Sequence, residues 1–116
     1  MAKVSNKTIA EVFRGAATRL RLHNTDNEEW DCNRNQRFIC RAICAYTGDY
    51  LWDSPNSRSD RTNAALEVIH TRMGSTGTLE DWLKENHNVR DRFLTPRKMQ
   101  AYRHAWLQSL IAEYSK

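Results

Sequence analysis

The sequence predicts an all-α fold, a compact single-domain bundle of about five helices with two long loops. The 116 residues include only four glycines and two prolines, too few for the many turns of an all-β domain. Apolar residues recur at three- and four-residue steps in most segments, which is the period of a helix with one buried face. No two segments show the alternation that paired strands require. The length fits one domain, spanning 1–116, around a modest core.

The first helix is expected to begin at Thr8, because Thr8 and Glu11 have the spacing of a capping box. Gly15 costs about 1 kcal/mol of helix stability relative to alanine, but it permits a close crossing with another helix. The apolar face of this helix consists of Ile9, Val12, Phe13, Ala16, Ala17 and Leu20.

A loop over 23–33 precedes the second helix, which is expected to start near Asn33 or Asn35, since either side chain can cap it. Gly48 stands where a glycine commonly ends a helix. The apolar side is formed by Phe38, Ile39, Ala42, Ile43 and Tyr46.

The second long loop, 48–59, contains a Ser-Pro-Asn run that is incompatible with helix, and we expect Leu51 and Trp52 to tuck inward from it. A third helix is predicted from Ser59 or Asp60 to Met73. A short fourth helix is predicted after Thr78.

The last helix is the clearest, because Thr95 is a good cap and Pro96 suits the first helical position. Its buried stripe is predicted to contain Met99, Tyr102, Trp106, Leu110 and Ile111.

Cys40 and Cys44 are four residues apart and therefore lie on one side of the second helix. A metal site would need two more ligands, such as Cys32 and a histidine, and the spacing matches no recognised zinc pattern. A redox pair would need the C-x-x-C spacing, which is absent. We therefore interpret both thiols as core residues, with a metal site and a reactive thiol as the alternatives.

Two basic stripes follow from the helical period. Arg14 and Arg21 lie seven residues apart on the first helix, with Lys7 one further step before them. The second stripe consists of Arg34, Arg37 and Arg41. They could contact phosphates or an acidic protein surface, or form an ordinary solvated face. No aromatic residue is interleaved with them for base stacking, and the net charge of +4 is modest for a nucleic-acid coating protein.

The histidines and acidic residues offer no recognisable chemistry. His70 and His104 fall within helices, and no spacing fixes a carboxylate beside either. The cluster Asp26, Glu28, Glu29 and Asp31 lacks the glycine and the spacing of a calcium loop. Walker, Rossmann, nucleophile-elbow and zinc-protease motifs are absent. We expect no enzyme activity, no catalytic or metal-binding residues and no cofactor.

Three aromatic residues lie in the predicted loops: Trp30, Tyr50 and Trp52. Aromatic and arginine side chains are enriched at interface hot spots, so one or more of the three could be a surface anchor. The residues we expect to contact a partner are Arg14, Arg21, Arg34, Arg37, Arg41, Trp30 and Trp52.

The segments RFICRAI (37–43), TLEDWL (78–83) and MQAYRHAWLQSLIAEY (99–114) resemble small accessory proteins encoded by tailed bacteriophages. The resemblance covers roughly 37–45 and 78–114 and implies a product acting in the host bacterial cytoplasm. It implies no site residues.

We therefore expect a phage-encoded binding protein that docks on a host or phage protein and modulates it, most simply by inhibition. The alternative is direct nucleic-acid binding through the basic stripes. The sequence has no apolar run typical of a secretory signal or a membrane span, which predicts a cytoplasmic protein without a membrane partner. The oligomeric state is left open.

Overall fold

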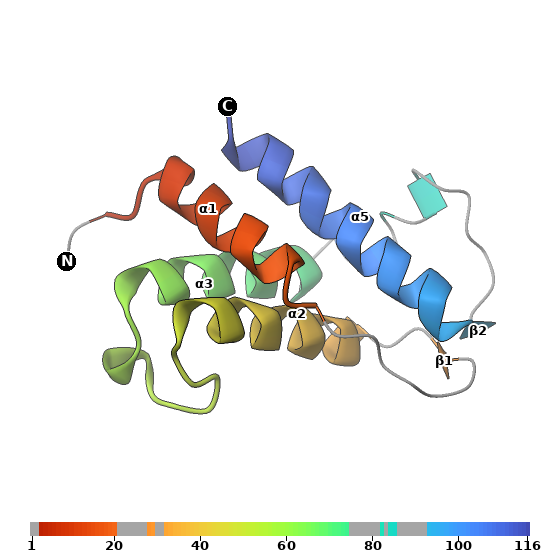
Figure 1. Cartoon of the computed structure of the whole chain (residues 1–116), viewed down its shortest axis with the longest axis horizontal. Coiled ribbons are helices and arrows are strands. Elements are labelled where there is room, and N and C mark those ends of the chain that lie inside the picture. The colour runs from red at the N-terminus through yellow and green to blue at the C-terminus, as the bar shows by residue number, and fades with distance from the viewer. Residues whose placement is uncertain (1–2, 21–27, 30–31, 75–81, 83, 86–92) are drawn as a thin grey trace.

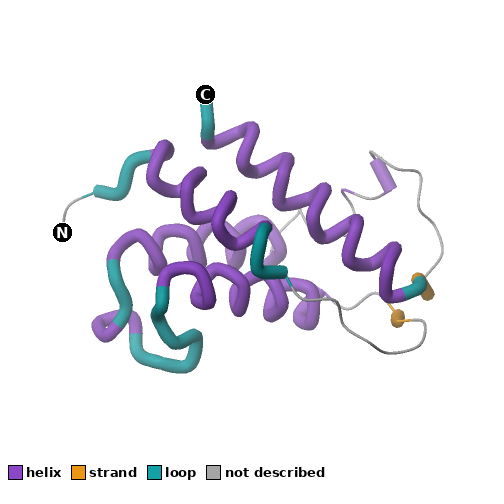
Figure 2. The backbone as a smooth tube through the Cα atoms, viewed as in Figure 1, coloured by secondary structure: helices purple, strands orange, loops and turns teal. Residues whose placement is uncertain are grey.

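The computed structural model describes residues 3–20, 28–29, 32–74, 82, 84–85 and 93–116. This part of the chain contains four α-helices and a short 3-10 helix, and helix dominates it (Figure 2). The helices are α1 (Asn6–Ala17), α2 (Cys32–Thr47), η1 (Pro55–Ser57), α3 (Asp60–Gly74) and α5 (Pro96–Tyr114). The predicted all-α fold is confirmed. The helix predicted after Thr78 lies outside the described residues, apart from helical backbone at 82 and 84–85.

The bundle has two layers (Figure 1). α1 and α5 run antiparallel in one layer, and α2 and α3 run antiparallel in the other. α1 packs against each of the other three helices, so the core lies around its apolar face. The core includes Ile9, Val12, Phe13 and Ala16 of α1, Ile39 and Ile43 of α2, Ala65, Leu66 and Ile69 of α3, and Trp106, Leu107 and Leu110 of α5.

A minimal strand pairing lies beside the bundle. β1 (Glu28–Glu29) pairs antiparallel with β2 (Phe93–Leu94) near the start of α5. The sequence did not predict it, because two residues are too few to show an alternating pattern.

The helix ends follow local capping chemistry. Thr95 accepts a hydrogen bond from the backbone N–H of Lys98 at 3.3 Å, and Pro96 occupies the first helical turn as predicted. Gly48 has a φ of 84° directly after α2, which confirms its role as the helix stop. The predicted cap Thr8 is wrong, because the backbone N–H of Thr8 itself donates to Ser5 Oγ at 3.2 Å. α1 therefore begins at Asn6, two residues earlier.

Gly15 permits the close crossing that the sequence suggested. A Cβ added at Gly15 would overlap the ring of Tyr46 on α2. The same ring is covered by two guanidinium groups, that of Arg19 at 5.0 Å and that of Arg61 at 5.5 Å from its centroid. Three helices therefore meet around one aromatic side chain.

One charged side chain lies inside the core. Arg103 is only 1% exposed, whereas Tyr102, a predicted member of the buried stripe of α5, is half-buried. Arg103 Nε donates to Asn35 Oδ1 at 2.6 Å, and its guanidinium lies 4.5 Å from the Phe38 ring centroid. Asn35 is thus an interior hydrogen-bond acceptor within α2, and α2 begins before it, at Cys32.

None of the described helices combines the length and apolar character needed to cross a lipid bilayer.

Candidate functional site

The connection between α2 and α3, residues 48–59, is closed by the carboxylate of Asp49. Asp49 Oδ2 accepts hydrogen bonds from the backbone N–H of Ser59 at 3.1 Å, from Ser59 Oγ at 2.9 Å and from Thr62 Oγ1. The Thr62 hydrogen bond is the first cause that lowers the pKa of Asp49, and the bonds from Ser59 act in the same direction. One side chain therefore ties the start of the loop to the first turn of α3.

A second set of hydrogen bonds crosses the middle of the loop. Arg58 Nε donates to Asn63 Oδ1 at 2.9 Å, and Arg58 Nη1 donates to the carbonyl oxygen of Leu51 at 2.9 Å. Asn63 Nδ2 in turn donates to the carbonyl oxygen of Pro55 at 2.7 Å. The loop is therefore held at several points along its length, and the orientation of the Arg58 guanidinium is set by two acceptors.

This ordered loop exposes two aromatic side chains. Tyr50 is 74% and Trp52 is 76% exposed, and no other large hydrophobic residue in the described part of the chain is exposed. The expectation that Trp52 tucks inward is wrong. Only Leu51 packs against the core, and its carbonyl is bound by Arg58, so the neighbouring side chains project away from the bundle. Trp52 and Tyr50 are instead both exposed, and their role as surface anchors stays a prediction.

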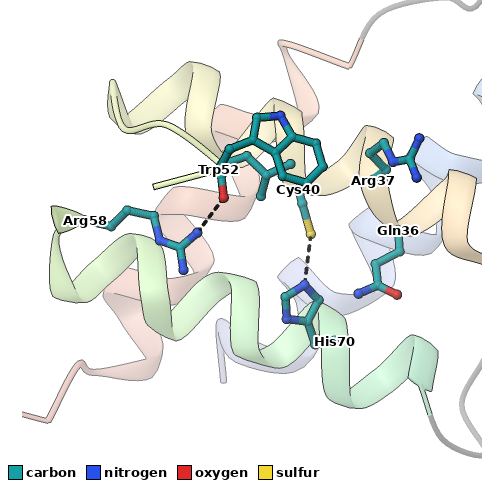
Figure 3. A pocket seen from close by; sticks show the side chains of 7 residues that line it. Gln36, Arg37, Cys40, Trp52, Arg58 and His70 are labelled. Atoms are coloured by element: carbon teal, nitrogen blue, oxygen red, sulfur yellow. Dashed lines mark hydrogen bonds between the residues drawn. The ribbon is translucent and has the colours of Figure 1, made fainter. Parts of the chain in front are cut away.

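Beside Trp52 lies an open pocket of about 380 Å³, which we call the basic pocket (Figure 3). It is formed where α2, the 48–59 loop and α3 meet. Gln36, Arg37 and Cys40 line it from α2, Leu51, Trp52 and Arg58 from the loop, and His70 from α3. The indole of Trp52 covers one side, and Arg58, His70 and Gln36 surround the opening.

The pocket is positively charged and contains no acidic side chain. Its lining includes two arginines and one histidine but no carboxylate. Within the described residues, neither Arg37 nor Arg58 forms an ion pair with a carboxylate. Burial, against the opposing charge of Arg58, raises the pKa of the Cys40 thiol to about 12. The thiol is therefore neutral at pH 7 and does not offset the guanidinium charges.

The interpretation of Cys40 and Cys44 as core residues is confirmed for burial, because both are buried within the hydrophobic cluster. Cys40 also lines the basic pocket, and its Sγ lies 3.9 Å from Nε2 of His70, another lining residue. Among the described residues, no three potential metal ligands come together. Because Cys32 contributes no described side chain, a metal-free protein stays a prediction.

The structure brings together two of the predicted contact residues, Arg37 and Trp52, which line the basic pocket. Arg41 is exposed one turn along α2, but it lines a different hollow, with Arg19 and Phe38. Arg14 is near neither of these hollows, since it donates to Ser115 Oγ at the end of α5 at 3.0 Å. Among the arginines whose side chains are described, those of the two stripes therefore line no common hollow. Arg21, Trp30 and the side chain of Arg34 lie outside the described residues.

The sequence pattern does not single out Arg58, and Tyr50 is not among the predicted contact residues. Arg58 stands alone in a polar loop, without the periodic spacing that drew attention to the arginines of α1 and α2. Its role depends on Asn63 and on the carbonyl of Leu51, and no local pattern encodes that combination. The one usable signal was the unusual density of loop aromatics at 50–52.

Compared with known proteins, the sequence matches no family model, and no solved structure matches the fold.

Proposed function

We propose that this chain is a small phage-encoded binding protein that docks on a host or phage protein and inhibits it by occupancy. The phage setting is the one implied by the sequence resemblance. The observation that carries the proposal is the exposure of Tyr50 and Trp52 on a loop held by its own hydrogen bonds. We call these two side chains, with the adjoining Arg37, the docking surface.

The docking surface has the properties of an interface anchor. Aromatic side chains bury large areas on binding, and tyrosine and tryptophan dominate hot spots. Ordering a flexible loop would cost free energy on association, whereas this loop is already tied at Asp49 and Arg58. Most of the free energy from burying the two rings is thus available for binding.

The charge beside the rings indicates the chemistry of the partner. Arg37 is exposed next to Trp52, and Arg58 lies on the other side of the indole. The most complementary partner is therefore a protein surface with an apolar centre and acidic residues at its edge. Charged residues at the edge of an interface mainly increase the association rate, while the two rings supply most of the affinity.

Affinity capture from bacterial host lysate tests this proposal when variants are compared side by side. We expect the wild-type chain to retain a specific protein, and Tyr50→Ala and Trp52→Ala each to lose it, since both side chains are exposed and the fold does not need them. Arg97→Ala, an exposed arginine at the start of α5, is the control and should retain it. Equal capture by all four chains would refute the docking surface.

A further inference from the structure

We propose that the basic pocket binds a nucleotide, with its phosphate at Arg58 and its base against the indole of Trp52. This goes beyond docking on a protein, although both proposals use Arg37 and Trp52. The ligand could be a free mononucleotide or one nucleotide of a single strand, since both carry the same chemical groups.

The pocket has the size and the preformed geometry of a small-ligand site. Its volume of about 380 Å³ lies within the range typical of such sites, roughly 300 to 1,000 Å³. Arg58 is oriented by Asn63 and by the carbonyl of Leu51, which engage its Nε and Nη1. Its Nη2 has no hydrogen-bond partner among the described residues and can donate to a ligand.

The charge of the lining selects an anion. Arg37 and Arg58 are both charged at neutral pH, no carboxylate lines the pocket, and the Cys40 thiol is neutral. Guanidinium groups present planar sets of N–H donors that match phosphate oxygens. A cationic ligand would be repelled, and a neutral ligand would gain nothing from the two guanidinium charges.

The aromatic wall distinguishes a nucleotide from a simple anion. The indole of Trp52 is 76% exposed and borders the opening, so a planar ring can stack on its free face. The amide of Gln36, from α2, has both donors and an acceptor with which to contact a base edge. Phosphate alone, or an acidic side chain of a partner, would engage the arginines but leave the indole unused.

The lining of the basic pocket also combines an aromatic side chain with arginines, a combination that the sequence pattern of the basic stripes does not show. The sequence shows no aromatic residue interleaved with the arginines, but the fold brings Trp52 and Arg37 into the lining of one pocket, although they stand 15 positions apart in the sequence (52 − 37). Stacking on one aromatic ring is worth about 1–3 kcal/mol per base, which corresponds to roughly a 5- to 150-fold gain in affinity.

Calorimetric titration of the full chain with four compounds tests the proposal: AMP, adenosine, inorganic phosphate and a tetraglutamate peptide. We expect AMP to bind at least about tenfold more tightly than adenosine or phosphate, because only AMP uses both Arg58 and the indole. AMP no tighter than phosphate would overturn the proposal, and so would tetraglutamate binding more tightly than AMP. The second result would assign the pocket to an acidic segment of a protein.

Three variants locate the binding. Arg37→Ala and Trp52→Ala each remove an exposed side chain, so we expect both variants to fold. Trp52→Ala should weaken AMP binding by about tenfold because it loses stacking, and Arg37→Ala should weaken it by a smaller factor because it removes one positive charge from the lining. Trp52→Phe keeps a stacking face and should restore most of the affinity. Arg97→Ala loses the same charge elsewhere and should bind AMP like the wild type. Equal loss in Arg97→Ala and Arg37→Ala would reduce the effect to net charge and overturn the site.

A single-stranded oligothymidylate of eight nucleotides distinguishes the two sources of the ligand. Binding much tighter than that of a free mononucleotide assigns the pocket to a strand, and weaker binding assigns it to a free mononucleotide. Tyr50→Ala separates this proposal from docking, because Tyr50 does not line the pocket. That variant should lose the captured protein but keep its affinity for AMP.

Discussion

At the scale of single residues, the pair formed by Arg103 and Asn35 is the main polar feature of the core. A buried guanidinium is tolerated only where its donors have acceptors, because leaving a charged group unsatisfied costs more than the bond itself contributes. Asn35 Oδ1 provides one such acceptor at 2.6 Å, and the Phe38 ring provides a favourable aromatic contact. The pair joins the first turn of α2 to the third turn of α5.

Replacement of Asn35 by alanine should lower the free energy of unfolding by about 2–4 kcal/mol, since it removes the acceptor and leaves Arg103 Nε buried without it. Urea denaturation followed by circular dichroism measures this. Asn56→Ala, at an exposed position in η1, is the matched control and should change the value by less than about 0.5 kcal/mol. Similar values for the two variants would contradict an interior role for Asn35.

At the scale of elements, two contacts set how the helices join. Gly15 on α1 lets the ring of Tyr46 on α2 approach the helix backbone, and the carboxylate of Asp49 binds the first turn of α3. The first contact depends on the absence of a side chain at Gly15, where two helices cross. The second depends on the short side chain of Asp49, just after the end of α2. Each can be tested by one substitution.

Gly15→Ala sets two effects against each other. Alanine stabilises a helix by about 1 kcal/mol relative to glycine, but overpacking against a neighbouring side chain typically costs about 1–3 kcal/mol. The added Cβ overlaps the ring of Tyr46 itself, so we expect the overpacking cost to prevail and the variant to be less stable. In a Tyr46→Ala background the same change should become stabilising. A loss of the same size in both backgrounds would show that the crossing is not responsible.

Asp49 should make stability depend on pH in the acid range. Its pKa in the folded chain lies below the ordinary value of 3.8, so the unfolded chain binds the proton more tightly. The stabilisation is therefore complete above pH 3.8 and is lost as the pH falls through the lowered pKa. We expect Asp49→Ala to reduce the free energy of unfolding by about 1 kcal/mol at pH 7, with the difference from wild type shrinking at acid pH.

Asp53→Ala is the control, because Asp53 is an exposed acid of the same loop whose side chain makes no hydrogen bond with the described residues. Chemical denaturation of the three chains across the acid range would show the effect. A difference between wild type and Asp49→Ala that stays constant down to about pH 2 would contradict the assigned hydrogen bonds.

At the scale of the whole molecule, the aromatic residues divide between the fold and the surface. Trp106 is buried where the helices meet, whereas Trp52 and Tyr50 contribute little to the core. Two exposed rings on one loop that contribute little to the fold are the basis of the proposal that they contact a partner.

Substitution of the two tryptophans should therefore change the free energy of unfolding by very different amounts. Trp106→Ala removes a large buried side chain and should lower the free energy of unfolding by about 3–5 kcal/mol. Trp52→Ala should change it by less than about 0.5 kcal/mol. Thermal unfolding of both variants tests the contrast. If Trp52→Ala were strongly destabilising, the residue would belong to the fold and both proposals that use it would lose their basis.

The sequence by itself determined the all-α fold class, the apolar faces of the helices and several helix ends. These features depend on residues three to seven positions apart, or on one backbone conformation, as at Gly48 and at Thr95 with Pro96. The start of α1 was predicted wrongly from the sequence, because Ser5 and Thr8 are both good N-cap residues and local spacing does not decide between them.

Only the tertiary structure decided which side chains meet across the bundle. Arg103 and Asn35 are 68 residues apart, and Cys40 and His70 are 30 apart, so no periodic pattern relates them. The basic pocket depends on three elements at once, because α2, the 48–59 loop and α3 each contribute to its lining. The exposure of Trp52 and the fixed orientation of Arg58 follow from hydrogen bonds that form only when the chain has folded.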